Sequence, residues 1–283
     1  MYRLAGSSAP RLLARAQGKK MGAMNAIDGT GTDRATCVLA PNPSPMTLDG
    51  TNTWIVAEPG ADRVVVIDPG PKDPVHLKRV VRAVQDRQVA QVLLTHGHPD
   101  HAAGAKKFAE LTGCKVVRAL DPRERLGDEG LAEGDVLGLD GLELRVMETP
   151  GHSDDSLCFW IPADGAILTG DTVLGYGSTV VDGNLGDYLG SLERLRAFAQ
   201  EKGALAILPG HGPKLDDPIA ALDKYLGHRR QRLAQVQAAL DAGAKTARDV
   251  VELVYKDVDK SLWPAAELSV RAQLEYLNLK GLT

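Results

Sequence analysis

Cysteines, aromatic residues and long apolar runs are all scarce in this chain of 283 residues. Its three cysteines, Cys37, Cys114 and Cys158, are odd in number and far apart, which argues against a disulfide framework and favours a reducing compartment. No apolar run is long enough for a secretory core or a membrane span, so we expect no membrane partner. Aromatic residues make up only 4% of the chain, so few rings are available to stack on nucleic-acid bases.

The charge balance argues against one class of nucleic-acid binder. A formal net charge of −4 does not suit a protein that bulk electrostatics holds on nucleic acid. The hydrophobic content of 43% and the charged content of 25% are ordinary for a globular protein. The length suits one large α/β domain with a small appendage, and the composition leaves the oligomeric state open.

The first 26 residues differ from the rest, because they carry five basic residues and no acidic one. An Arg-rich leader without acids is typical of a mitochondrial transit peptide, but a disordered tail or an overlong start has the same composition. Met21 and Met24 offer alternative starts. We expect residues 1–26 to be a disordered leader of a cytoplasmic protein, with a mitochondrial protein as the alternative.

Residues 95–101, Thr-His-Gly-His-Pro-Asp-His, concentrate potential metal ligands directly after an apolar segment. Neutral imidazole and carboxylate are ligands that Zn²⁺ and similar divalent ions prefer. Burying His96, His98, Asp100 and His101 together at the end of a strand costs stability unless something binds them. This segment therefore predicts a metal site.

Three more potential ligands stand where apolar segments end. His152 follows a Pro-Gly turn after the alternating segment 142–147, Asp171 closes the run that begins at residue 166, and His211 follows the run 204–208. Loops at strand ends are the usual place where a rigid sheet presents functional groups. We expect these segments and residues 95–101 to meet in one site.

In this order the residues resemble the pattern of the metallo-β-lactamase superfamily, His-x-His-x-Asp-His followed by His, Asp and His, over about residues 52–213. The resemblance implies two Zn²⁺ or similar divalent ions per chain. It also implies that Asp68 orients a metal ligand from behind, although an Asp-Pro-Gly turn is common at strand ends without such a role. The ligands that it implies are His96, His98 and His152 for the first ion, Asp100, His101 and His211 for the second, and Asp171 for both.

Two positions separate the chain from other branches of this superfamily. Asp171 stands where the commonest class of zinc β-lactamases has a cysteine, and His98 stands where di-iron relatives have a glutamate. Antibiotic hydrolysis and di-iron redox chemistry are therefore both disfavoured.

Segments 48–56, 149–155 and 170–181 resemble the β-lactamase-like protein 2 group, which is linked to endoribonuclease activity on single-stranded RNA.

The resemblance implies hydrolysis by a hydroxide that bridges the two metals, with Asp100 and Asp171 as the catalytic carboxylates. Hydrolysis of phosphodiester bonds in single-stranded RNA is the first hypothesis. A thioesterase of the hydroxyacylglutathione or acyl-carrier type is the second, because the same hydroxide can attack a thioester. A non-catalytic metal-stabilised binding protein is the third. Asn52, Tyr176 and Ser178 are candidate substrate contacts, although a purely structural role suits their loops equally well.

The apolar patterns predict an α/β fold, and the resemblance makes it the αββα sandwich of the superfamily, with a catalytic domain over residues 27–217. The predicted strands are 52–57, 63–68, 89–95, 115–118, 142–147, 157–161, 166–168 and 204–208, and the predicted helices are 74–86, 101–112 and 187–201.

Residues 218–283 change to helical patterns only, and they resemble the small, all-helical, winged-helix-like appendage of the same group. We expect helices over 219–226 and 229–242, one that Thr246 caps with Asp249, and one that starts near Pro264. The chain ends at Thr283, which leaves little length for a wing, so a helical cap over the cleft is favoured over direct duplex contact. Arg229, Arg230 and Arg232 are candidates to grip a phosphate or carboxylate, or simply form a solvated helix start.

Overall fold

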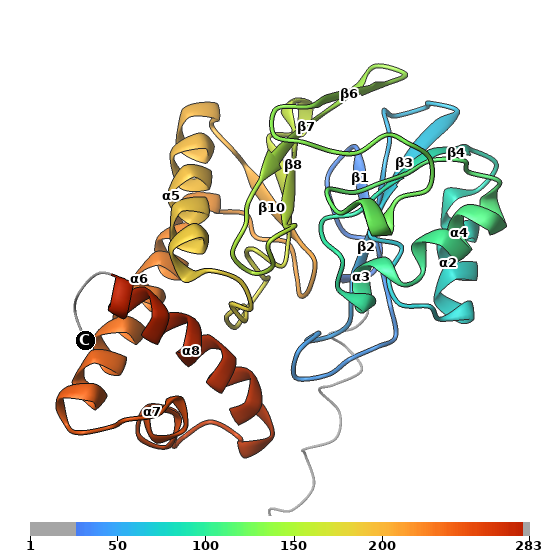
Figure 1. The fold of residues 1–283 in the computed structure, drawn as a ribbon. Coiled ribbons are helices and arrows are strands. Elements are labelled where there is room, and N and C mark those ends of the chain that lie inside the picture. Colours follow the sequence, from blue (N-terminus) through green and yellow to red (C-terminus); the bar gives the residue numbers. More distant parts are fainter. Residues whose placement is uncertain (1–26, 280–283) are drawn as a thin grey trace, which may run out of the picture.

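The computed structural model describes residues 27–279, so the predicted leader, residues 1–26, lies outside the described residues. Two five-stranded sheets face each other, and helices cover their outer faces (Figure 1). This arrangement confirms the predicted αββα sandwich. In order across the first sheet the strands are β1 (Ala35–Leu39), β2 (Asn52–Val56), β3 (Arg63–Ile67), β4 (Gln88–Leu93) and β5 (Val117–Arg118). In order across the second they are β10 (Ala206–Pro209), β9 (Ala166–Gly170), β8 (Leu157–Ile161), β7 (Leu142–Glu148) and β6 (Val136–Leu139).

The main core fills the space between the two sheets. β7 shows how the sequence builds it, because Leu142, Leu144 and Val146 are buried while Arg145 between them is exposed. Helices α2 (Pro74–Val84) and α4 (Ala105–Thr112) cover the first sheet, and α5 (Leu185–Lys202) covers the second. Their apolar faces form two outer cores, so each sheet is buried on both sides.

One predicted helix, residues 101–112, is wrong in its bounds. The structure has a short α3 (Pro99–Ala102) and then α4, with a break at Gly104. The backbone of Gly104 packs so closely on the turn after β3 that a Cβ there would lie 2.7 Å from Gly70 O. Only glycine permits this approach, and it ends one helix and starts the next.

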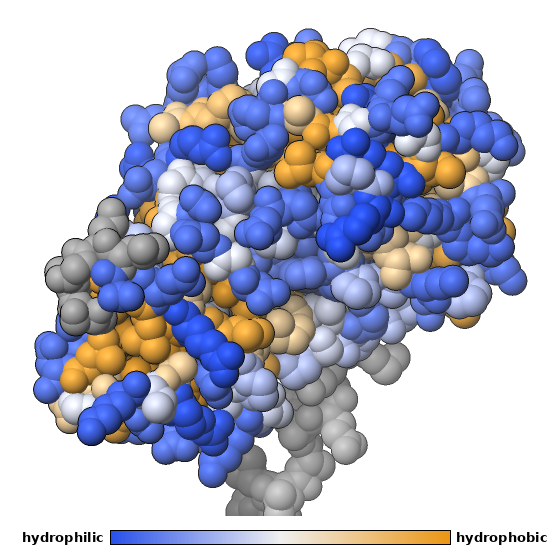
Figure 2. All heavy atoms as spheres, viewed as in Figure 1, coloured by the Kyte–Doolittle hydropathy of each residue, from blue (hydrophilic) through white to orange (hydrophobic). Residues whose placement is uncertain are grey.

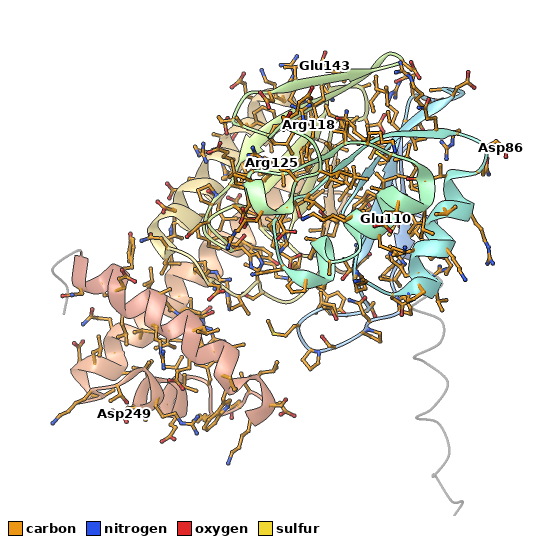
Figure 3. All side chains as sticks on the ribbon, turned by 45° about the vertical axis from the view of Figure 1, so that its right-hand side comes forward. Asp86, Glu110, Arg118, Arg125, Glu143 and Asp249 are labelled. Carbon is orange, nitrogen blue, oxygen red and sulfur yellow. The ribbon has the colours of Figure 1, made fainter. Side chains whose placement is uncertain are left out.

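Two strands and one helix also differ from the predictions. Strands β1 and β6 were not predicted, because five and four residues at sheet edges carry too short a pattern to be recognised. The segments 219–226 and 229–242 form one continuous helix, α6 (Pro218–Asp241), because exposed Gly227 is tolerated inside it. Two arginines fix the connection between β5 and β6: Arg118 Nε donates to Gly130 O and Arg125 Nε to Ala119 O (Figure 3).

The C-terminal part consists of helices, as predicted: α6, α7 (Ala247–Val254), the short η3 (Lys260–Leu262) and α8 (Trp263–Leu279). The predicted cap is confirmed, since Thr246 Oγ1 accepts from Asp249 N and the Asp249 carboxylate accepts from Thr246 N (Figure 3 labels Asp249). Side chains of Val236, Val250 and Val270 form a separate small core. Figure 2 shows hydrophobic residues gathered on this part at the lower left, among hydrophilic ones.

Helix α6 joins the two parts, since Leu222 packs on the outer core of the second sheet while Val236 belongs to the helical core. The division of the chain at residue 217 therefore stays a prediction. Among residues 27–279, no helix is long and apolar enough to cross a membrane. All three cysteines are free and buried, and the predicted compartment stays a prediction.

Candidate metal centre

The site lies where the carboxyl ends of strands from both sheets meet. Strand β4 ends at Leu93, and the chain then passes His96 before Pro99 begins α3, which brings Asp100 and His101 back to the same place. Strand β9 delivers Asp171 and β10 delivers His211. The four segments predicted to converge do so.

A first group of donors consists of three imidazoles. His96 Nε2 lies 3.1 Å from His98 Nδ1, and His152 Nε2 lies 3.0 Å from the same atom. His96 and His152 are buried and His98 is half-buried. Three nitrogen atoms directed at one another in a dry place form a site for a cation.

A second group combines one carboxylate with two imidazoles. His211 Nε2 lies 3.1 Å from Asp100 Oδ2 and 3.2 Å from His101 Nε2. His101 Nε2 lies 3.4 Å from the same Asp100 oxygen. Both histidines are fully buried, so this group can also hold a metal ion.

Asp171 stands between the two groups. Its Oδ2 lies 3.7 Å from His152 Nε2 in the first group and 3.2 Å from His211 Nε2 in the second. Its Oδ1 is buried and makes no hydrogen bond, although His101 Nε2 is 3.4 Å away. A buried carboxylate oxygen without a hydrogen bond costs stability unless a cation meets it. This oxygen shows that the residues fit a metal ion.

The backs of four of these rings are held by acceptors. Asp68 Oδ2 accepts from His101 Nδ1 at 2.8 Å, and the same carboxylate accepts from Thr95 N and Thr95 Oγ1. Nδ1 of His96 faces Thr95 Oγ1, and those of His152 and His211 donate to the carbonyls of Val180 and Gly50. Each contact fixes the ring and leaves Nε2 for a metal. The structure thus places Asp68 behind His101, where the resemblance implied an orienting residue.

Burial and charge set the protonation of these groups. Burial lowers the pKa of His96 well below its usual value, and the neighbouring rings of His101 and His152 act in the same direction. Burial opposes the charged form of His211, but Asp171 and Asp100 outweigh it and raise its pKa to about 9. A metal at the second group must therefore displace protons, so its binding weakens as the pH falls.

Three residues predicted to contact the substrate lie in different environments. Asn52 is wholly buried, and its amide donates to the carbonyls of Pro209 and Gly212 across the two sheets. The structure therefore corrects that expectation, because the Asn52 side chain is buried and its amide joins the two sheets. Tyr176 is exposed and donates to Asp49, so it joins two loops. Ser178 lines a cavity of about 50 Å³ that also touches His152 and Asp171.

The predicted arginine cluster divides in the same way. Arg229 is 5% exposed, and its guanidinium donates to Ser178 Oγ and to Thr179 O, so it is not free to grip a substrate. Arg230 is exposed and lies 3.7 Å from Glu193 of α5. A substrate contact by exposed Arg230 stays a prediction. Of the three, Arg232 is half-buried and lines a cavity together with Arg229.

Sequence reasoning missed several residues that shape the site. Thr95, between the apolar strand and the first ligand, links Asp68 to His96 through its hydroxyl. Thr51 Oγ1 lies 3.4 Å from Asp100 Oδ2. The loop carbonyls that accept from His152 and His211 leave no sequence signal, because any residue supplies a carbonyl. Met46, 48% exposed beside the site, could have been found only from its place in the fold.

Comparisons with known proteins agree with this geometry. The family model described as Metallo-beta-lactamase superfamily matches residues 46–211, and that of the Beta-lactamase associated winged helix domain matches residues 246–283. The Beta-lactamase-like protein 2 homolog of Drosophila melanogaster is 33% identical over 264 residues, which cover 86% of this chain and 87% of that protein. The Atrochrysone carboxyl ACP thioesterase of Aspergillus chevalieri is 32% identical over 242 residues, 82% of this chain and 76% of that protein.

A solved structure shows the same fold along most of the chain. The metallo-beta-lactamase family protein from Thermus thermophilus has a TM-score of 0.72 at 25% identity, covering 88% of this chain and 94% of that one. The fold, both family models and the relatives lead to one assignment. The chain belongs to the metallo-β-lactamase superfamily of hydrolases, is related to the β-lactamase-like protein 2 homologues, and carries the winged helix domain associated with this superfamily.

Proposed function

We propose that the protein is a hydrolase that works with two divalent ions, zinc by the chemistry of its ligands. His96, His98 and His152 would hold one ion, Asp100, His101 and His211 the other, and Asp171 both. When bound, two such ions lower the pKa of a water toward neutrality and neutralise charge that develops on the substrate. The observation that carries the proposal is the Asp171 carboxylate, whose Oδ2 lies between the two groups of donors and whose Oδ1 is buried without a hydrogen bond.

The residues of the chain have three tasks in this scheme. Asp68, Thr95 and the loop carbonyls keep the imidazole rings in one tautomer and one orientation. Asp100 and Asp171 supply negative charge: burial would raise the pKa of Asp100, but His101 and His211 lower it to about 2. The small cavity beside His152 and Asp171 admits a scissile bond from one side.

For the substrate we propose an acyl thioester, whose C–S bond is replaced by a C–O bond from water to give a carboxylate and a thiol. Two observations favour it over the RNA hypothesis. The guanidinium of Arg229 donates to Ser178 Oγ and Thr179 O, so part of the expected phosphate-binding cluster is already engaged within the protein. A relative with 32% identity is named as an acyl-carrier thioesterase.

Single-stranded RNA is the second candidate, because the β-lactamase-like protein 2 homologues are relatives at 30% and 33% identity. In both reactions the metal ions would activate a water and polarise the bond that it attacks. The metal site alone therefore does not distinguish thioester hydrolysis from RNA hydrolysis.

Arg229 gives the helical appendage a further task at the metal site. Its guanidinium, 5.1 Å from the centre of the Tyr188 ring, holds Thr179 O and Ser178 Oγ. The next carbonyl along this loop, Val180 O, accepts from His152 Nδ1. Arg229 is therefore a positioning residue that acts on His152 through the loop.

A substrate panel tests the proposed reaction. Metal-replete protein should hydrolyse acyl thioesters of N-acetylcysteamine, and chelator-treated protein should not. RNA oligomers tested at the same protein concentration should be cleaved more slowly, if at all. Cleavage of RNA with no turnover of any thioester would contradict the thioesterase proposal.

Asp171→Asn tests the shared carboxylate. The amide keeps the shape but removes the charge that offsets two dications, so the rate should fall by more than about 100-fold, the upper end of what losing an orienting partner costs. Asp216→Asn is the matched control, since Asp216 is exposed and pairs only with Lys214 among the described ion pairs. Circular dichroism checks that the fold persists. A near wild-type rate in Asp171→Asn with both metals bound would remove Asp171 from the mechanism.

Arg229→Gln tests the positioning role. Zinc affinity of the ion held by His96, His98 and His152 should fall by about 10- to 100-fold, because the loop that orients His152 loses its anchor. Arg230→Gln, one residue further along the same helix, is the control and should bind zinc like the wild type. A competition titration with a chromophoric chelator measures both. Equal affinities in the two variants would show that Arg229 serves only the packing of α6.

A further inference from the structure

A second cavity, of about 240 Å³, lies between the loops beside the metal site and the helical appendage. It shares Pro45, Met46, Ser178, Thr179 and Val180 with the small cavity that touches His152 and Asp171. The two cavities therefore border the same pair of loops. We name the larger one the side pocket, and its far wall is built by Val258, Leu262, Ala265 and Ala266 of the appendage.

Half of the residues that line the side pocket are apolar, and two arginines and a histidine are among the other half. Met46 and Val180 line its junction with the metal site, and the appendage adds two alanines, a valine and a leucine. Met46 is 48% exposed, although it is a large apolar side chain beside a polar site. Exposed apolar surface that lines a concave site is typical of ligand pockets.

Several polar groups of the side pocket are engaged with one another, although Arg229 Nε is buried without a hydrogen bond. Ser178 Oγ and Thr179 O accept from Arg229, and Ser269 Oγ accepts from Val181 N. Arg232 lies 4.6 Å from the centre of the Tyr255 ring and donates to Gln235. A nucleobase brings polar edges that would be buried here with few partners, and such edges are costly to bury. A hydrocarbon chain carries no such cost.

The charges that line the side pocket do not repel an acyl chain or the carboxylate formed from it. None of the described residues that line the side pocket is acidic. His228 in its wall is neutral, because burial and then the neighbouring Arg229 and Arg232 lower its pKa to about 4.

We propose that the side pocket binds the apolar acyl chain of the substrate while the scissile bond lies at the metal site. This inference rests on the proposed thioesterase function and adds a chain-length preference that the appendage sets. Ala265, half-buried in α8, is the residue through which that preference is tested, because a larger side chain there fills the pocket.

The experiment measures kcat/KM for N-acetylcysteamine thioesters from acetyl to dodecanoyl. In the wild type we expect kcat/KM to rise with chain length by up to about fourfold per methylene until the pocket is full. Ala265→Phe should flatten this rise and leave the acetyl thioester unchanged. Ala238→Phe, at an exposed alanine of α6 outside the pocket, is the matched control. The same chain-length profile in Ala265→Phe and wild type would overturn the proposal.

A second variant and a binding measurement keep the test independent of folding and of turnover. Leu262→Trp fills the pocket from η3 and should act like Ala265→Phe. Calorimetry with the thioether S-octyl-N-acetylcysteamine should give a negative heat-capacity change in the wild type that both variants lose.

The binding measurement with the thioether also distinguishes failure of the proposed function from failure of the side-pocket proposal. If no thioester is hydrolysed by metal-replete protein but the thioether binds and both variants abolish it, the proposed function fails while the pocket stands as an apolar site. If thioesters are hydrolysed and the thioether binds equally to all variants, the inference fails alone. Adenosine monophosphate that binds the wild type and is lost in both variants would assign the pocket to a nucleotide and overturn the acyl chain.

Discussion

The structure depends on one buried carboxylate. Asp171 follows a strand of the second sheet, its Oδ2 lies between the two groups of donors, and its Oδ1 makes no hydrogen bond. Burial would raise the pKa of Asp171, but His211 and His101 lower it well below its usual value. A dry anion among five histidines is costly unless a cation completes it, so metal binding and the folding of these loops are coupled.

The rest of the fold supports this carboxylate by fixing the imidazole rings around it through hydrogen bonds to their Nδ1 atoms. The first sheet supplies Asp68 and Thr95, and the turn before β2 supplies Gly50 O for His211. The appendage contributes through Arg229, which anchors the loop that carries Val180 O to His152. Helix α6, which precedes the residues that match the winged helix domain, is thus joined to the metal site by these contacts. A substitution in the appendage should therefore alter metal binding, although no residue of the appendage is a metal ligand.

Much of this could be predicted from the sequence, because metal ligation demands particular residue types at particular places. The motif at residues 95–101, the Pro-Gly-His turn and the strand-end Asp171 rarely occur together without a metal to bind, and the structure brings them together. Strands with a clear alternation, such as β7, were also predicted within two residues. Edge strands β1 and β6 were missed, because they are too short for a pattern.

The substrate contacts were harder to predict from the sequence, since the side chain of a polar residue near a motif can point into the protein or out to solvent. Asn52 turned out to join the sheets and Arg229 to clamp a loop, because each amide or guanidinium found buried carbonyls that no local pattern reveals. Only the folded chain shows that apolar residues from segments more than 200 residues apart, such as Met46 and Ala266, line one cavity.

The central claim is that two metal ions share Asp171, and elemental analysis of protein purified with excess zinc tests it most directly. The account predicts close to two zinc ions per chain in the wild type and a loss of at least one in Asp171→Ala. One ion or none in the wild type, or two firmly held ions in Asp171→Ala, would contradict it.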